Sequence, residues 1–196
     1  MKADVLRRAL LGKTGASSDF DLNPGTVLPP GRILRAAAVL IAVQEFPDGP
    51  RVLLTKRASH LKHHPGQISF PGGKVELSDA SPTAAALREA HEEVGLPTGL
   101  VQVVGSLPSH ETVTGFTVQP ILAQITAPFS PIPERGEVEE VFSAPLDFIT
   151  NPANFRVEAR FWQGSMRRYY TVPYGPYYIW GATARMLFSL AERLKA

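Results

Sequence analysis

A helix predicted over Pro82–Val94 constrains the fold of this chain more than any other segment. Ser81 is suited to cap its first turn, Pro82 to occupy its first position, and Gly95 to end it. The neighbouring segments have the apolar patterns of strands, without a regular strand–helix alternation. We therefore expect an α/β (α+β) protein in which a mixed β-sheet is sandwiched between α-helices.

The remaining predicted elements are mostly short. Strands are expected at residues 36–43, 51–55, 101–107, 116–125 and 138–142, and a hairpin at 155–162 and 166–172. Helices are expected at residues 1–11, 146–150 and 182–194. Residues 1–32 are interpreted as an N-terminal helix and arm packed on a single domain formed by residues 33–196.

Three glutamates share one face of the predicted helix. Glu89, Glu92 and Glu93 are three or four residues apart, and the apolar residues Leu87, Ala90 and Val94 fall on the opposite side. The three carboxylates repel one another, and the helix dipole disfavours negative charge in this C-terminal half. A divalent cation such as Mg²⁺ would remove the repulsion and still accept phosphate oxygens. The acids therefore indicate a metal site, with a merely solvated acidic face as the alternative.

A glycine pair and an arginine accompany these acids. Gly72 and Gly73 precede the helix, where their backbone groups could reach a metal ion and phosphates. Arg88 either holds the preceding loop by a salt bridge or neutralises the acidic cluster. We favour the salt bridge.

Composition excludes several kinds of protein. The chain has 196 residues and no cysteine, so disulfide scaffolds, thiolate metal sites and cysteine nucleophiles are excluded. Its net charge of +2 is too small to indicate a nucleic-acid partner. No signal peptide or apolar run long enough to span a membrane is found. We expect a cytoplasmic protein, for which a homodimer is compatible with the sequence.

Residues 73–96 resemble the Nudix box, G-x5-E-x7-R-E-U-x-E-E-x-G-U, in which U is aliphatic. Every specified position of its second half is matched by the run Arg88-Glu89-Ala90-His91-Glu92-Glu93-Val94-Gly95-Leu96. The first half departs from the box, because Asp79 replaces its glutamate and eight residues rather than seven precede Arg88. The role of Asp79 therefore stays open.

The segment before the box resembles a second and more selective pattern. This is the signature LLTxR[S/A]x3Rx3Gx3FPGG of coenzyme A pyrophosphatases within the Nudix hydrolase superfamily. It is matched by Leu53-Leu54-Thr55-Lys56-Arg57-Ala58, Lys62, Gly66 and Phe70-Pro71-Gly72-Gly73. Lys62 stands where the signature has arginine, which retains charge but loses a bidentate fork. Residues 179–185 also resemble the end of these proteins.

The resemblance implies a fold, an activity and a set of ligands. It implies the Nudix fold and hydrolysis of the diphosphate of coenzyme A or its thioesters, giving 3′,5′-ADP and (acyl-)4′-phosphopantetheine. Mg²⁺ or Mn²⁺ would be held by Glu89 and Glu93, with Glu92 assisting and the Gly73 carbonyl contributing. Together with Arg88, these glutamates form the expected catalytic set.

Residues expected to contact the substrate lie in the signature segment. They are Arg57, Lys62, Gly66, Gln67, Phe70, Gly72 and Gly73. A diphosphate is anionic and resists attack, so positioned cations such as Arg57 and Lys62 would hold the oxygens that the metal leaves free. The alternative is that both are ordinary charges of a strand end and a loop.

The general base is left open. Glu89 or Glu92 could accept the proton of water, and so could an acid from the later charge run Glu137, Glu139 and Glu140. The isolated histidines, His63, His64, His91 and His110, are more typical of structural or surface positions.

The predicted hairpin interleaves arginines with aromatic residues. Such a pattern occurs where proteins stack single-stranded nucleic acid. We favour instead a hairpin with one buried aromatic face and one solvated basic face. A third interpretation is that the hairpin holds the adenine end of the substrate.

Two competing functions remain. One is a Nudix hydrolase acting on ADP-ribose, dinucleotides or nucleoside triphosphates, although residues 107–112 lack the array typical of the ADP-ribose and NADH subgroups. The other is a Nudix-like domain that binds a nucleotide or RNA without turnover. The intact Arg88, Glu89, Glu92 and Glu93 make it the least favoured.

Overall fold

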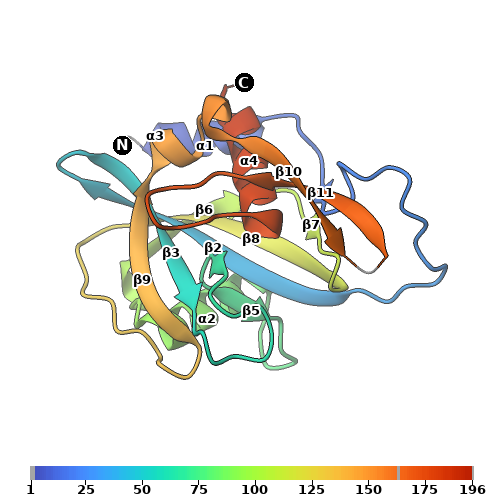
Figure 1. The fold of residues 1–196 in the computed structure, drawn as a ribbon. Coiled ribbons are helices and arrows are strands. Elements are labelled where there is room, and N and C mark those ends of the chain that lie inside the picture. Colours follow the sequence, from blue (N-terminus) through green and yellow to red (C-terminus); the bar gives the residue numbers. More distant parts are fainter. Residues whose placement is uncertain (1–2, 163, 196) are drawn as a thin grey trace.

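Strand β2 (Arg35–Phe46) organises the molecule, because its apolar residues are buried on both faces of the sheet. The computed structural model describes residues 3–162 and 164–195, and within them β2 lies in a nine-stranded mixed sheet (Figure 1). β2 pairs in parallel with β8 (Phe116–Ile125) and antiparallel with β3 (Gly49–Arg57). The smaller strands extend this centre: β1 (Ser17–Ser18), β4 (Ile68–Ser69), β5 (Gly72–Lys74), β6 (Val101–Ser106), β7 (His110–Glu111) and β9 (Val138–Pro145).

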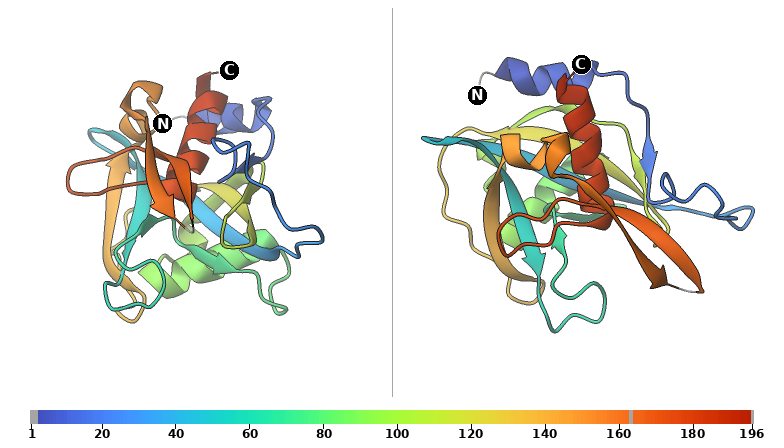
Figure 2. Two further views of the ribbon diagram at one scale, coloured as in Figure 1. Left: turned by 45° about the vertical axis from the view of Figure 1, so that its right-hand side comes forward. Right: turned by 45° about the horizontal axis from the view of Figure 1, so that its top comes forward.

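Helices cover both faces of this sheet (Figure 2). Leu40 and its β2 neighbours of even number pack against α2 (Pro82–Val94). Ile41 and Val43 point the other way, into a core shared with α1 (Ala3–Leu11) and α4 (Gly181–Lys195). This follows from the two-residue period of a strand, which sends successive side chains to opposite faces. The predicted mixed sheet between helices is confirmed.

Helix α2 has the predicted bounds for the predicted reasons. The Ser81 hydroxyl accepts a hydrogen bond of 3.1 Å from the Ala84 N–H. Gly95 ends the helix with a φ of 67°, a left-handed conformation that glycine adopts without strain. The short helices are α3 (Leu146–Ile149) and the 3₁₀ turns Thr98–Leu100 and Pro152–Asn154. Strands β1, β4, β5 and β7 were not predicted, because two or three residues are too few to show a period.

The N-terminal helix and arm are attached to the same core. Leu6 and Ala9 of α1 are fully buried. Arg193 of α4 is also buried and donates to the carbonyls of Ala9 (2.6 Å) and Leu10 (3.1 Å) at the end of α1. The arm then adds β1 to the sheet edge beside β7. The division at residue 33 stays a prediction.

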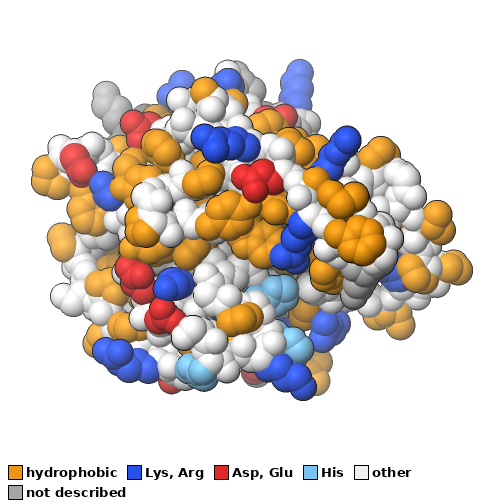
Figure 3. Space-filling model, in the orientation of Figure 1, with side chains coloured by type: hydrophobic (Ala, Val, Ile, Leu, Met, Phe, Trp, Pro, Cys, Tyr) orange, Lys and Arg blue, Asp and Glu red, His pale blue; other side chains and the backbone are white. Residues whose placement is uncertain are grey.

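The predicted hairpin forms a separate two-stranded sheet of β10 (Arg156–Trp162) and β11 (Ser165–Thr171). Our interpretation of its faces was wrong. The register places Arg160 and Trp162 on the same face, which turns toward the body of the protein. Phe161 and Met166 lie on the opposite face, where they are 70% and 61% exposed. Apolar and basic side chains are accordingly interspersed over the hairpin (Figure 3).

Among the described residues, no helix is both long enough and apolar enough to cross a membrane.

Candidate active site

The three glutamates of α2 differ greatly in exposure. The Glu92 side chain is 56% exposed and that of Glu89 is 16% exposed. Glu93 is only 6% exposed, although it shares a helix face with Glu89 and Glu92, so this face is not the solvated one of the alternative interpretation. The 70–74 segment passes beside this end of α2 and covers the Glu93 carboxylate, which no helical pattern could reveal.

Glu93 is held where a negative charge is costly. Its carboxylate accepts a hydrogen bond of 3.0 Å from the Gly72 N–H. Burial is the main cause that raises the pKa of Glu93 to about 7. The carboxylates of Glu89 and Glu137 act in the same direction, against the hydrogen bond from Gly72 and the charge of Arg57. Burial likewise raises the pKa of Glu89. Two neighbouring carboxylates that resist ionisation together would gain from a bound cation.

The glycine pair is required by the closeness of these acids. A Cβ added to Gly73 would lie 2.5 Å from the carboxylate carbon of Glu89. Gly72 has a φ of 153°, and a Cβ there would collide with the backbone of β2. The pair thus lets the chain pass between β2 and the carboxylates of α2.

Arg88 performs both of the roles that the sequence left open. Its guanidinium donates two hydrogen bonds of 3.0 Å to Asp79 and one of 3.2 Å to the Lys74 carbonyl, which hold the loop before α2. It also donates at 3.0 Å to Glu89 and at 3.0 Å to Glu92. The hydrogen bonds from Arg88 hold the pKa of Asp79 below its ordinary value. Asp79 therefore positions Arg88, despite its departure from the box.

The three acids Glu137, Glu139 and Glu140 differ in their hydrogen-bond and ion-pair partners. Glu139 binds Lys56 at 2.7 Å and accepts the Ser59 N–H, and Glu140 accepts the Tyr177 hydroxyl at 2.5 Å. Glu137 is exposed, and its charge raises the pKa of both Glu89 and Glu93. Of this charge run, Glu137 is the acid whose field reaches both α2 carboxylates.

Two adjoining cavities lie between the signature segment, the hairpin and the start of α4. The first, of about 460 Å³, we name the tyrosine cavity; it is lined by Lys56, His64, Pro65, Gly66, Gln67, Ile68, Glu140, Arg160, Pro176, Tyr177, Tyr178 and Trp180. The second, of about 240 Å³, we name the arginine cavity; it is lined by Asp19, His64, Gln67, Thr112, Val113, Thr114, Arg160, Trp162, Arg167, Arg168, Tyr169, Trp180, Gly181 and Ala182.

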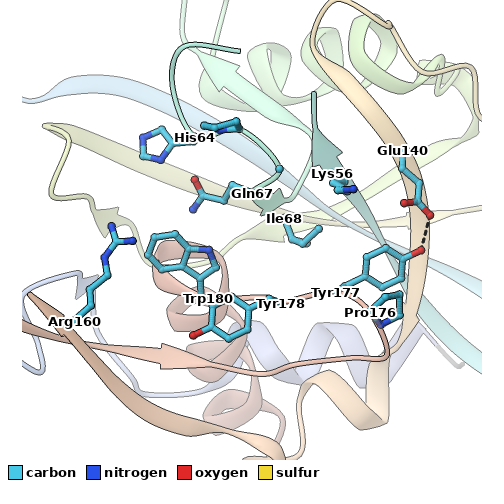
Figure 4. A pocket seen from close by; sticks show the side chains of 12 residues that line it. Lys56, His64, Gln67, Ile68, Glu140, Arg160, Pro176, Tyr177, Tyr178 and Trp180 are labelled. Atoms are coloured by element: carbon cyan, nitrogen blue, oxygen red, sulfur yellow. Dashed lines mark hydrogen bonds between the residues drawn. The ribbon is translucent and has the colours of Figure 1, made fainter. Parts of the chain in front are cut away.

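The shared wall of the cavities is formed by four side chains. These are His64, Gln67, Arg160 and Trp180. Figure 4 shows them at one end of the tyrosine cavity, while the hydrogen-bonded Tyr177 and Glu140 close the other end.

Comparison with known proteins assigns the family. The model of the NUDIX domain matches residues 34–160. Two curated relatives carry the name "Uncharacterized Nudix hydrolase NudL". The one from Enterobacter sp. (strain 638) is 42% identical over 160 residues, which are 82% of this chain and 83% of that protein. The one from Salmonella paratyphi B is 43% identical over the same shares. This chain is a Nudix hydrolase.

A solved structure agrees with this assignment. RenU, a Nudix hydrolase from M. smegmatis, superposes with a TM-score of 0.50 and 29% identity over 58% of this chain and 71% of its own. Nudix hydrolases act on small molecules and generally use divalent metal ions.

The donor set of this Nudix hydrolase fits such an ion in its chemistry. Glu89 and Glu93 offer carboxylate oxygens, the ligands that Mg²⁺ and Mn²⁺ prefer, and burial raises the pKa of both. Glu92 is mostly exposed and, like Glu89, accepts a hydrogen bond from Arg88. Within residues 3–162 and 164–195, no three acidic or histidine side chains converge on one metal position. Glu92, the third carboxylate of α2, would have to leave Arg88 to become a ligand.

The residues that we predicted to contact the substrate have different settings in this Nudix hydrolase. Gly66 and Gln67 line the cavities. Arg57 lines neither cavity, but its charge lowers the pKa of both His64, which lines the two cavities, and Glu93. Its Nε is buried and lacks a hydrogen-bond partner among the described residues. Lys62 is exposed and lines neither cavity, and Phe70 is 2% exposed in the core.

Sequence reasoning missed the wall formed by residues 173–180. Tyr177, Tyr178 and Trp180 line the tyrosine cavity, and Trp180 also lines the arginine cavity. The available signal was the density of proline, glycine and tyrosine just before α4. Such a run is typical of a structured loop that can shape a binding site.

Proposed function

We propose that this Nudix hydrolase cleaves the diphosphate of coenzyme A or its thioesters, releasing 3′,5′-ADP and 4′-phosphopantetheine or its acyl form. The observation that carries the proposal is the course of the segment that resembles the coenzyme A signature. Its residues Lys56, Gly66 and Gln67 line the cavities, and its glycine end contacts Glu93 and Glu89. The segment thus connects a pocket for the substrate to the acids that would act on it.

We assign the cation to Glu89 and Glu93, with Glu92 and the Gly73 carbonyl as further donors. Bound Mg²⁺ or Mn²⁺ would supply neutralisation of the diphosphate charge and activation of water. The chain's own contribution begins with Arg57, whose buried and unpaired Nε is available to a phosphate oxygen. Arg88 and Asp79 keep the acidic end of α2 against the loop.

Glu137 is our candidate for the general base. It is exposed, and Glu139 and Glu140 are engaged by Lys56 and Tyr177. Its carboxylate would accept the proton of the attacking water from the side of the acids that faces away from the core. Replacing Glu137 should therefore lower kcat and change its pH dependence, with a smaller effect on the affinity for substrate.

A substrate panel tests the proposal. The full chain is incubated with Mg²⁺ or Mn²⁺ and coenzyme A, acetyl-coenzyme A, ADP-ribose, NADH or a diadenosine polyphosphate, and products are separated by chromatography. We expect 3′,5′-ADP and 4′-phosphopantetheine from coenzyme A, and no such products from the Glu93→Gln variant. Cleavage of ADP-ribose or a dinucleotide with coenzyme A left intact would overturn the proposal in favour of another Nudix pyrophosphatase activity.

A further inference from the structure

We infer that the arginine cavity binds the nucleoside end of the substrate through its additional phosphate, whereas the tyrosine cavity takes the uncharged remainder. This inference deepens the proposed function and rests on it for the identity of the substrate. It assigns a polarity to the site: one end selects a phosphomonoester on a nucleoside, and the other selects a neutral chain.

An unbalanced pair of arginines is the first observation. Arg160 and Arg167 are directly opposite one another on β10 and β11, so their guanidinium groups project from the same face. Like charges in this position destabilise a sheet. Among the described residues, neither guanidinium has a carboxylate partner or a hydrogen bond. An anion seated between them would remove the repulsion.

The carboxylate of Asp19 does not fill this role, although it lines the same cavity. One of its oxygens lies 3.2 Å from His110 Nε2, and the other accepts the Val113 N–H at 2.9 Å. Its charge is therefore directed to the edge of the sheet. The cavity keeps an excess of positive charge for a ligand.

Aromatic surfaces beside the arginines are the second observation. Arg160 lies over the Trp180 ring at 4.6 Å and Arg167 over the Trp162 ring at 4.9 Å. Tyr169 packs edge-on against Trp180. Guanidinium and indole planes are the groups on which nucleobases stack, and an arginine fork suits a phosphate. A ligand that carries both a phosphate and a planar base is a phosphorylated nucleoside.

The tyrosine cavity has a contrasting electrostatic character. Lys56 is neutralised by Glu139 at 2.7 Å, and Glu140 accepts a hydrogen bond from Tyr177. Away from the shared wall, where Arg160 and His64 lie, its charged groups Lys56 and Glu140 are thus already engaged, and hydroxyl and proline surfaces remain around them (Figure 4). Such a lining suits an uncharged chain with amide and hydroxyl groups better than a second phosphate.

Binding without metal or turnover provides the first test. Both tryptophans of the chain line the arginine cavity, so their fluorescence reports on its occupant. The full chain is titrated with 3′,5′-ADP, 5′-AMP and 4′-phosphopantetheine. We expect 3′,5′-ADP to bind tightest, and Arg167→Gln to weaken it about ten- to a hundred-fold while changing 5′-AMP little. Arg156→Gln, on the same hairpin but outside both cavities, is the matched control.

Equal losses of 3′,5′-ADP and 5′-AMP affinity in Arg167→Gln would overturn the assignment, and so would an equal effect of Arg156→Gln. Steady-state kinetics then separates the inference from the proposed function. Wild type should prefer coenzyme A over 3′-dephospho-coenzyme A in KM, and Arg167→Gln should abolish that preference. An unchanged preference with normal turnover would refute the inference alone. Tight, Arg167-dependent binding of 3′,5′-ADP without coenzyme A hydrolysis would refute the proposed function alone.

Discussion

The acidic end of α2 and the arginine cavity both gather charges of one sign, but they compensate them differently. The acids have a counterion inside the protein, because Arg88 binds Glu89 and Glu92. Among the described residues, Arg160 and Arg167 have aromatic rings instead of a carboxylate. The acids lie on a helix that packs against the main sheet, and they are buried to different degrees. Both arginines lie on a hairpin outside that sheet.

The acidic centre is therefore held in a fixed geometry, whereas the arginine pair can adjust when a ligand binds. Glu93 is fixed by the Gly72 N–H and by burial, so its position does not depend on a bound ion. The arginines are held by weak contacts with rings, each worth about 0.5–1 kcal/mol at exposed sites, and can adjust to an anion. We expect substitutions among the acids to affect chemistry and those among the arginines to affect selection.

The largest effect is expected for Glu93→Gln on turnover. The neutral amide keeps the shape and can still accept the Gly72 N–H, but it removes a charged oxygen from the proposed cation site. We expect kcat to fall on the order of a thousandfold. Glu192→Gln on α4 makes the same chemical change outside the proposed cation site and is the control. Retained activity with unchanged metal dependence would remove Glu93 from the proposed ligands.

The same variant should be more stable than wild type at high pH when no metal is present. The pKa of Glu93 rises from 4.5 to about 7 in the folded chain, so folding is penalised as the pH rises from 4.5 to 7 and the full penalty applies above 7. We expect Glu93→Gln to raise the free energy of unfolding by about 3 kcal/mol at pH 8, and by less than about 1 kcal/mol at pH 5. Urea denaturation at the two pH values measures this. An equal difference at both would contradict the electrostatic cause.

Next in size is the double substitution Arg160→Gln/Arg167→Gln. Removal of both guanidinium groups should lower kcat/KM for coenzyme A about a hundredfold, because two charge-assisted contacts to phosphate are lost. The effect on 3′-dephospho-coenzyme A should be far smaller. Arg8→Gln/Arg156→Gln makes the same change of net charge outside both cavities. If that control loses as much activity, long-range attraction rather than the cavity explains the result.

The smallest effect is expected for Asp79→Asn. This change weakens the paired hydrogen bonds that hold Arg88, so Arg88 can shift against Glu89 and Glu92. We expect kcat/KM to fall about tenfold, as for other residues that orient metal ligands without contacting the metal. Asp48→Asn, which disturbs only an exposed pair with Arg51, is the control. Wild-type activity in Asp79→Asn would show that Arg88 needs no anchor in the loop.

Much of the frame was predictable because its signals are local. The bounds of α2 follow from Ser81, Pro82 and Gly95, and the buried part of β2 follows from the continuous apolar run at residues 36–43. The hairpin β10–β11 was also predicted, but the interpretation of its faces was wrong. A strand pattern shows which residues share a face, yet only the docking of the hairpin decides which face meets the protein.

The sequence was sufficient to identify the family, the acidic helix, the glycine pair and the packing of that helix on a sheet. These depend on residue types at short spacing, where chain geometry leaves few choices. Tertiary structure was needed to show that Glu93 is buried, that Arg88 binds Asp79 as well as two glutamates, and that Arg160 lies over the Trp180 ring in a cavity wall. Burial and pairing of charges depend on segments that meet through folding, and spacing along the chain does not record which segments these are.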